Sequence, residues 1–232
     1  MPDILVLLPA RNEAEGIGEV IDRIPKRKIS ERGYRTIVLV VDGNSTDSTR
    51  EIARSKGAKV LLQGNSIGKG NGVRESLDYI ANSTEINPEI VVMLDSDATY
   101  SPEDIPRFID SLKENDVVWG SRLKGVMEKN AMSRVNRLGN IILSLSASII
   151  HFKRTTDLCT GFWGFRSAAL DSLNLIAKGF SLEADIFASV SRAKLKTLEI
   201  PIDYAHREGH SSLTWYIDGP KILLMIIRRR FY

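Results

Sequence analysis

The sequence predicts an α/β fold in which helices flank a mostly parallel central sheet, in a Rossmann-like arrangement. Through the first 120 residues, short apolar runs alternate with segments that carry apolar residues at helical spacing, as strands and helices do in such folds. The apolar runs are rich in β-branched residues, which is typical of strands buried on both faces. Several runs end in polar or charged residues, at the carboxyl ends of strands, where open α/β sheets bind ligands.

Five strands are expected in the first half of the chain. They lie at residues 4–8, 36–41, 59–62, 90–94 and 117–119. Apolar residues at helical spacing predict helices at residues 17–24, from about residue 48, and at 73–81, and the turn at 101–104 predicts the start of another. The glycines between residues 64 and 72 predict a flexible loop around Lys69.

The pattern changes after residue 120. A long helix is expected at residues 132–151, then a strand near 161–165, a helix near 182–193 and a last strand near 197–202. We interpret residues 1–212 as one domain, in which residues 123–212 extend the first half, residues 1–122. Residues 213–232 join an apolar run to Arg228, Arg229 and Arg230, and such amphipathic, basic segments can lie at a membrane interface.

The composition is that of an ordinary globular protein. With 43% hydrophobic and 26% charged residues, bulk disorder is not expected, and a net charge of +3 does not indicate a nucleic-acid partner. The single cysteine, Cys159, excludes an internal disulfide and fits a reducing compartment. The sequence starts without a signal-peptide pattern, and its longest apolar run, residues 141–150, is shorter than the roughly 20 residues that span a bilayer. We therefore expect no transmembrane helix.

Asp95 and Asp97 follow the strand expected at residues 90–94. Carboxylates two positions apart can share one hard divalent cation, and Mg²⁺ typically takes one or two protein carboxylates and completes its shell with phosphate oxygens and water. The alternative is a turn that caps a helix at a solvated edge. A strand as apolar as this one rarely ends in two unpaired acids. The hypothesis is therefore a site for a metal ion and a diphosphate.

Other strand ends supply candidate ligand-binding residues, each with a simpler alternative. Pro9-Ala10-Arg11-Asn12-Glu13 could hold a nucleotide base and ribose, or could be a plain helix start. Asp42 could accept hydrogen bonds from a nucleotide, or could be an ordinary turn residue before Gly43. Gly68-Lys69-Gly70 could bring a cation to phosphates, although it lacks the Walker spacing.

Arginines follow the next strand end. Arg122 would reach the same crevice, where its guanidinium suits phosphate recognition. Arg134 and Arg137 face one side of a helix and either bind phosphate or form a solvated basic face. Asp157 is the candidate base for an acceptor that must lose a proton. No Ser-His-Asp order or nucleophile elbow is present, which argues against hydrolase chemistry.

Six motifs together suggest a family. They are Leu8-Pro9-Ala10-Arg11-Asn12-Glu13, Val41-Asp42-Gly43-Asn44-Ser45-Thr46-Asp47, Asp95-Ser96-Asp97, Gly120-Ser121-Arg122, residues 157–165 and Gly209-His210-Ser211. In this order and spacing they resemble the inverting family 2 glycosyltransferases of GT-A fold. Among these they look most like the polyprenyl-phosphate sugar synthases of the dolichyl-phosphate mannose synthase type.

The resemblance implies a nucleotide-sugar donor bound by residues 1–122, with a divalent metal, Mg²⁺ or Mn²⁺, on Asp95 and Asp97. It implies donor contacts from Pro9, Ala10, Arg11, Glu13 and Asp42. To these we add Lys69 and Ser96. It also implies that the phosphate of an acceptor lipid binds Arg122 together with Arg134 or Arg137. To these phosphate ligands we add Ser211. The expected catalytic residues are Asp97, Arg122 and Asp157.

Three positions depart from the family pattern. Relatives often have two acids where this chain has Asp42-Gly43, which affects base recognition. They usually have a Gln at the position of Thr99, as a further metal contact. Their late lysine is absent from Gly209-His210-Ser211-Ser212.

The expected reaction is inverting transfer of a hexose from a nucleotide sugar, with GDP-mannose favoured, to a polyprenyl or dolichyl phosphate. A phosphate monoester, with a second pKa near about 6, is largely anionic at neutral pH and needs no strong base. The alternatives are UDP-glucose or UDP-N-acetylglucosamine as donor, a glycan or small-molecule hydroxyl as acceptor, and a non-catalytic nucleotide-sugar-binding subunit. We expect a peripheral protein at the cytoplasmic face of a membrane, and a membrane-anchoring protein is a candidate partner.

Overall fold

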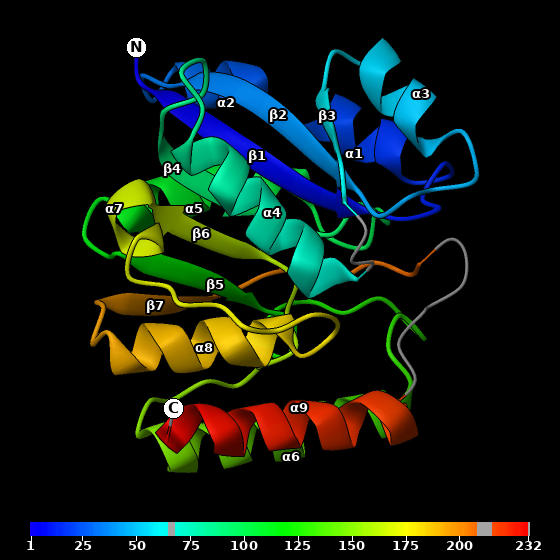
Figure 1. Cartoon of the computed structure of the whole chain (residues 1–232). Coiled ribbons are helices and arrows are strands. Elements are labelled where there is room, and N and C mark those ends of the chain that lie inside the picture. The colour runs from blue at the N-terminus through cyan, green and yellow to red at the C-terminus, as the bar shows by residue number, and fades with distance from the viewer. Residues whose placement is uncertain (65–67, 208–214, 232) are drawn as a thin grey trace.

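The chain forms a seven-stranded sheet with helices on both faces (Figure 1). The computed structural model describes residues 1–64, 68–207 and 215–231. In spatial order the strands are β3, β2, β1, β4, β6, β5 and β7. Their bounds are Lys59–Leu62 (β3), Arg35–Asp42 (β2), Asp3–Ala10 (β1), Pro88–Met93 (β4), Trp163–Arg166 (β6), Val117–Ser121 (β5) and Thr197–Pro201 (β7).

The sheet is mostly parallel, which confirms the predicted fold class. Strands β3, β2, β1 and β4 run in one direction, and β5 and β7 are parallel to each other. Only β6 among the described strands is antiparallel to its neighbours, β4 and β5. Because β6 and β7 come from the second half of the chain, both halves contribute to one sheet.

Two hydrophobic cores lie on the two faces of the sheet, because successive side chains of a strand point to opposite sides. Ile4, Val6 and Leu8 of β1 enter one core, whereas Leu5 and Leu7 enter the other. The first core is covered by α1 (Ile17–Arg23), α2 (Lys26–Ser30), α3 (Thr49–Ser55), the short 3₁₀ turn Pro102–Asp104 and α5 (Ile105–Leu112). The second is covered by α4 (Lys69–Ala81), α7 (Ser167–Leu170) and α8 (Leu182–Arg192).

A further helical layer packs outside α8. It consists of α6 (Arg134–His151) and the last helix, α9 (Trp215–Phe231), which contact each other and both contact α8. Figure 1 shows this pair at the bottom of the molecule, at the opposite end from β3 and α3. In the described parts of the chain, no helix is long and apolar enough to cross a membrane.

The predicted strands agree with the observed ones to within a few residues, and one local prediction is wrong. The segment around Lys69 is not a flexible loop, because α4 begins at Lys69 and includes Gly70 and Gly72. A Cβ at Gly70 would lie 2.5 Å from the backbone oxygen of Ala177. The glycine therefore permits a close approach of two backbones rather than flexibility.

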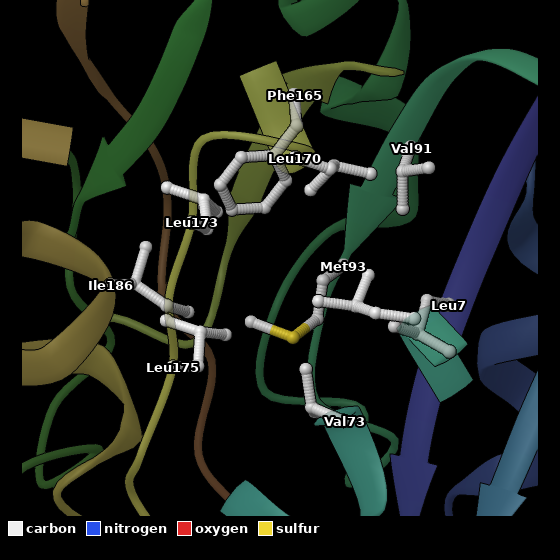
Figure 2. A pocket seen from close by; sticks show the side chains of 10 residues that line it. Leu7, Val73, Val91, Met93, Phe165, Leu170, Leu173, Leu175 and Ile186 are labelled. Atoms are coloured by element: carbon white, nitrogen blue, oxygen red, sulfur yellow. The ribbon is translucent and has the colours of Figure 1, made fainter. Parts of the chain in front are cut away.

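An apolar space lies within the second core (Figure 2). Side chains from β1, β4, α4 and α8 surround it, among them Leu7, Met93, Val73 and Ile186. Its volume of about 10 Å³ is close to the minimum for one water molecule, and its walls are apolar. It is a packing defect of the core, and a ligand site must be sought elsewhere.

Candidate active site

The loops that follow β1, β2 and β4 meet at one edge of the sheet. Parallel pairing places Ala10 opposite Asp42, and Leu7 opposite Met93, so these strands end side by side. Ser96 Oγ donates to the backbone oxygen of Pro9 at 2.7 Å, which ties the β4 loop to β1. The sheet thus brings the first three predicted motifs together.

Asn12 joins the loops after β1 and β2. Its backbone N–H donates to Ser45 Oγ at 2.9 Å, and its side-chain oxygen accepts from the backbone N–H of Thr46 at 2.8 Å. Asn12 has a φ of 56°, a left-handed conformation that asparagine adopts more readily than most residues. These bonds fix the backbone that presents Arg11 and Glu13 at the edge.

Asp42 is fully buried beneath this junction. Its carboxylate accepts from the backbone N–H of Ser45 at 3.0 Å and from the Ser45 hydroxyl, and Arg50 Nε lies 3.9 Å away. In this state Asp42 stabilises the loop instead of facing the crevice. Its predicted contact with the donor stays a prediction, as do those of Pro9, Ala10 and the exposed Arg11.

Lys69 binds two carboxylates. Its Nζ lies 2.6 Å from Asp95 Oδ1 and 2.6 Å from Glu183 Oε1, so it connects the end of β4 to the first turn of α8. Burial lowers the pKa of Lys69, but the two carboxylates outweigh burial and hold that pKa above its ordinary value. Burial also raises the pKa of Glu183, against the effect of Lys69.

Arg207 makes the corresponding contacts with Asp97 and Glu13. Its Nη1 lies 3.0 Å from Asp97 Oδ2 and its Nη2 lies 2.7 Å from Glu13 Oε1. Burial, helped by the charges of Asp97 and Asp95, raises the pKa of Glu13 to about 7, although Arg207 opposes the shift. The pKa of Asp97 is raised by burial and by Asp95. Four carboxylates and two cations of the chain therefore meet at this edge.

Thr99 binds Asp97 directly. Its hydroxyl donates to Asp97 Oδ1 at 2.6 Å and its backbone N–H donates to the same oxygen at 3.2 Å. Both bonds favour the charged carboxylate. At the position where the resembling family usually has a Gln, this chain thus has a hydroxyl that orients the acid.

The two acids fit a divalent cation that takes only part of its shell from the protein. Among the described residues no three acidic, histidine or cysteine side chains are grouped as a metal cluster, and the candidate ligands in this part of the chain are the pair Asp95 and Asp97. Gly161 leaves room for the first of them, because a Cβ there would lie 2.3 Å from Asp95 Oδ2. A pair of hard oxygen ligands suits Mg²⁺ or Mn²⁺ with phosphate and water as further ligands.

Arg122 and Asp157 form a buried ion pair. Asp157 Oδ2 accepts from Arg122 N and Nε, both at 2.8 Å, and Oδ1 accepts from Arg122 Nη2 at 2.7 Å and from Asn140 Nδ2 at 2.6 Å. The Arg122 guanidinium also lies over the Tyr204 ring, 5.1 Å from its centroid. Four donors saturate Asp157, so the structure does not support it as a free general base. Its role as a base stays a prediction; in this structure its carboxylate holds the Arg122 guanidinium.

Two of the remaining predicted phosphate ligands lie on α6. Arg134 and Arg137 are exposed at the start of α6, and within the described chain no hydrogen bond or ion pair joins either to Arg122. Ser211, with the motif Gly209-His210-Ser211, lies outside the described residues.

Sequence reasoning missed the partners of the acids. The sequence pattern assigned no site role to Arg207 or to Glu183. Asp185, its neighbour in sequence, is structural: it accepts from the backbone N–H groups of Ile176 and Ala177 and lies 2.8 Å from Arg229 Nε. The available sequence signal was the presence of two acids, Glu183 and Asp185, at the start of an otherwise apolar helical segment.

Comparison with known sequences places this site in context. The model of the family described as Glycosyl transferase family 2 matches residues 5–173. The glycosyltransferase AglJ of Haloferax volcanii is 35% identical over 98% of this chain and 72% of the relative. The dolichyl-phosphate hexose transferase of the same organism is 32% identical over 97% of this chain and 93% of the relative. The undecaprenyl-phosphate mannosyltransferase of Micrococcus luteus is 27% identical over 95% and 91%.

A solved structure has the same architecture. The glucosyl-3-phosphoglycerate synthase of Mycobacterium tuberculosis, in a crystal structure with Mn²⁺ and UDP-glucose, matches with a TM-score of 0.74 and 22% identity over 98% of this chain and 79% of the other. At this identity the likeness concerns the fold. It confirms the GT-A arrangement of the sheet and its flanking helices.

Proposed function

Because the chain belongs to glycosyltransferase family 2, we propose that it transfers a hexose from a nucleotide sugar to a polyprenyl phosphate, with inversion at the anomeric carbon. The product is a lipid-phosphate sugar. The observation that carries the proposal is the pair Asp95 and Asp97 at the carboxyl end of β4, gathered with Lys69 and Arg207 at one edge of the sheet. The names of the two relatives that transfer hexose to dolichyl or undecaprenyl phosphate support the acceptor class.

Asp95 and Asp97 are the residues that would hold Mg²⁺ or Mn²⁺. A divalent cation, when bound there, supplies a Lewis acid where negative charge gathers on the departing diphosphate. Lys69, in contact with Asp95, adds fixed positive charge at the same edge. Arg207, in contact with Asp97 and Glu13, neutralises part of the charge of these acids.

The acceptor needs positive charge more than it needs a base. A phosphate monoester is already largely anionic at neutral pH, with a second pKa of about 6, so the site must hold it in line with the anomeric carbon. We assign this task to Arg122, whose guanidinium is fixed by Asp157 and Tyr204. Arg134 and Arg137, on the outer surface of α6, are candidates for the approach of the lipid phosphate.

The finer assignments follow from the same proposal. Residues 1–122 bind the donor and residues 123–212 bind the acceptor, although both share the sheet. GDP-mannose is the favoured donor, with UDP-glucose and UDP-N-acetylglucosamine as alternatives. The enzyme acts as a peripheral protein at the cytoplasmic face of a membrane.

The test is a matrix of donors and acceptors. Purified protein is incubated with GDP- and UDP-sugars, with dolichyl phosphate or with non-lipid alcohols, in Mg²⁺, Mn²⁺ or EDTA. We expect one nucleotide sugar to label the lipid phosphate, and only with a divalent cation. Transfer restricted to non-lipid acceptors would reject the proposal.

A further inference from the structure

The helix α6 turns its apolar residues outward. Five of them, together with the residue that follows the helix, recur at alternating spacings of three and four and are 51–83% exposed: Val135, Leu138, Ile142, Leu145, Ile149 and Phe152. A surface helix of a globular protein normally shows the opposite orientation. A continuous apolar stripe of this kind marks an interaction surface.

The inward face of α6 carries polar side chains that bond to neighbouring segments, among them Asp157 of the candidate site. Asn140 Nδ2 donates to Asp157 at 2.6 Å, Ser144 Oγ accepts from the backbone N–H of Leu158 at 2.8 Å, and the His151 ring contacts the backbone oxygen of Ile226 at 3.0 Å. The orientation of α6 is therefore fixed by specific bonds. Its outward apolar stripe is a property of the folded protein.

The last helix extends this surface. α9 packs beside α6, buries Ile222 and Ile226, and exposes Ile217, Leu224 and Phe231, of which Leu224 is 64% exposed. The ends of the two helices are joined by Arg230, whose guanidinium lies 5.2 Å from the centroid of the Phe152 ring. Figure 1 shows both helices at the outer boundary of the molecule.

The positive charge of α6 and α9 indicates which kind of partner binds this surface. Residues 134–151 contain no acid, and residues 215–231 contain one, Asp218, which is buried and lies 3.4 Å from Lys221. Basic residues with exposed side chains border the apolar stripe: Arg134, Arg137, Lys221, Arg228 and Arg230. A second copy of the chain would bring the same positive charges onto themselves, whereas anionic lipid headgroups would neutralise them.

We propose that the outward faces of α6 and α9 together form the surface that docks this protein on an anionic lipid bilayer. The apolar side chains enter the interface and the basic residues contact lipid phosphates. Through Asn140 and Asp157, this places the Arg122 site directly behind the docking helix. The choice of a lipid partner rests on the proposed function, but the inference assigns the docking to α6 as well as to the basic C-terminal segment.

The test measures vesicle binding and needs no turnover. Purified protein is floated with phosphatidylcholine vesicles that contain or lack phosphatidylglycerol, without donor or acceptor. We expect flotation with the anionic vesicles. The double substitution Leu138→Glu/Leu145→Glu should weaken it about tenfold or more, because it places charges where apolar groups enter the interface. Arg134→Gln/Arg137→Gln should weaken it mainly at low salt.

Leu62→Glu is the matched control, because Leu62 is 49% exposed on β3 at the other end of the molecule (Figure 1). It should float like the wild type, and circular dichroism checks that all variants are folded. Absence of flotation, or equal flotation of the leucine variant, would overturn the inference. So would a wild-type dimer in sedimentation that the leucine variant dissociates. Flotation without sugar transfer would support the docking surface and reject the proposed function. Sugar transfer without flotation would support the proposed function and reject the docking surface.

Discussion

Arg207 Nη1 lies 3.0 Å from Asp97 Oδ2, and the same guanidinium binds Glu13 at 2.7 Å. A cation of the chain thus lies against one of the two carboxylates that we propose as metal ligands. Lys69 holds the equivalent relation to the other carboxylate, Asp95. The acids are therefore already neutralised in part, and a divalent cation must compete with these side chains.

Arg207→Gln should increase affinity for Mn²⁺. The substitution removes a positive charge in contact with Asp97, so we expect a dissociation constant lower by about tenfold at low salt, measured by calorimetry without nucleotide. Arg27→Gln is the control, since Arg27 pairs with Glu31 at the surface with its side chain 92% exposed. Unchanged or weaker Mn²⁺ binding in Arg207→Gln would contradict the competition.

The raised pKa of Glu13 predicts a dependence of stability on pH. Folding raises this pKa from 4.5 to about 7, so between these values the folded protein retains a proton that the unfolded chain has lost. The contribution of Glu13 to stability is present below pH 4.5 and is lost as pH rises through 7. Glu13→Gln cannot ionise. Relative to the wild type it should therefore gain stability between pH 5 and pH 8, measured by urea unfolding; a constant difference would show that the pKa is not raised.

Asp157→Asn tests the structural role of Asp157. It leaves the buried Arg122 without its charge partner, and breaking a buried pair in this way costs about 3 kcal/mol. Urea unfolding at pH 7 should show this loss. Asp104→Asn breaks the partly exposed pair with Arg107 and should cost at most about 1 kcal/mol. Full stability of Asp157→Asn together with lost activity would instead restore its role as a base.

Gly161→Ala should displace the carboxylate of Asp95. The added methyl group would lie 2.3 Å from Asp95 Oδ2, so the carboxylate must shift and Mn²⁺ binding should weaken. Gly139→Ala is matched, because nothing lies within 4 Å of its added Cβ, and in α6 it should stabilise the helix by up to about 1 kcal/mol. Equal Mn²⁺ binding by both variants would argue against Asp95 as a ligand.

The central sheet could be predicted from the sequence because the pattern that identifies each strand lies within the strand itself. β-branched apolar runs identify strands, and the carboxyl end of such a run places Asp95 and Asp97 at the edge where ligands bind. The loop around Lys69 was predicted wrongly because a glycine there is required by a tertiary contact with the backbone of Ala177. No local pattern carries that information.

The partners of the site residues could not be predicted for the same reason. Arg207 and Glu13 meet across 194 positions of sequence, and Lys69 and Glu183 meet across 114. The orientation of α6 was also hidden. Its apolar residues have helical spacing, which usually identifies a buried face, but the bonds of Asn140 and Ser144 turn the polar face inward.

The most direct test of the proposed function compares the wild type with Asp97→Asn on one acceptor. Both are incubated with dolichyl phosphate, Mn²⁺ and the preferred nucleotide sugar, and the extracted lipid is analysed by mass spectrometry. The wild type should convert the lipid phosphate to its hexosyl ester, and Asp97→Asn, with an unchanged thermal unfolding midpoint, should yield no product above the EDTA blank. Equal product from the folded variant, or no hexosyl lipid from the wild type with any donor, would contradict the account.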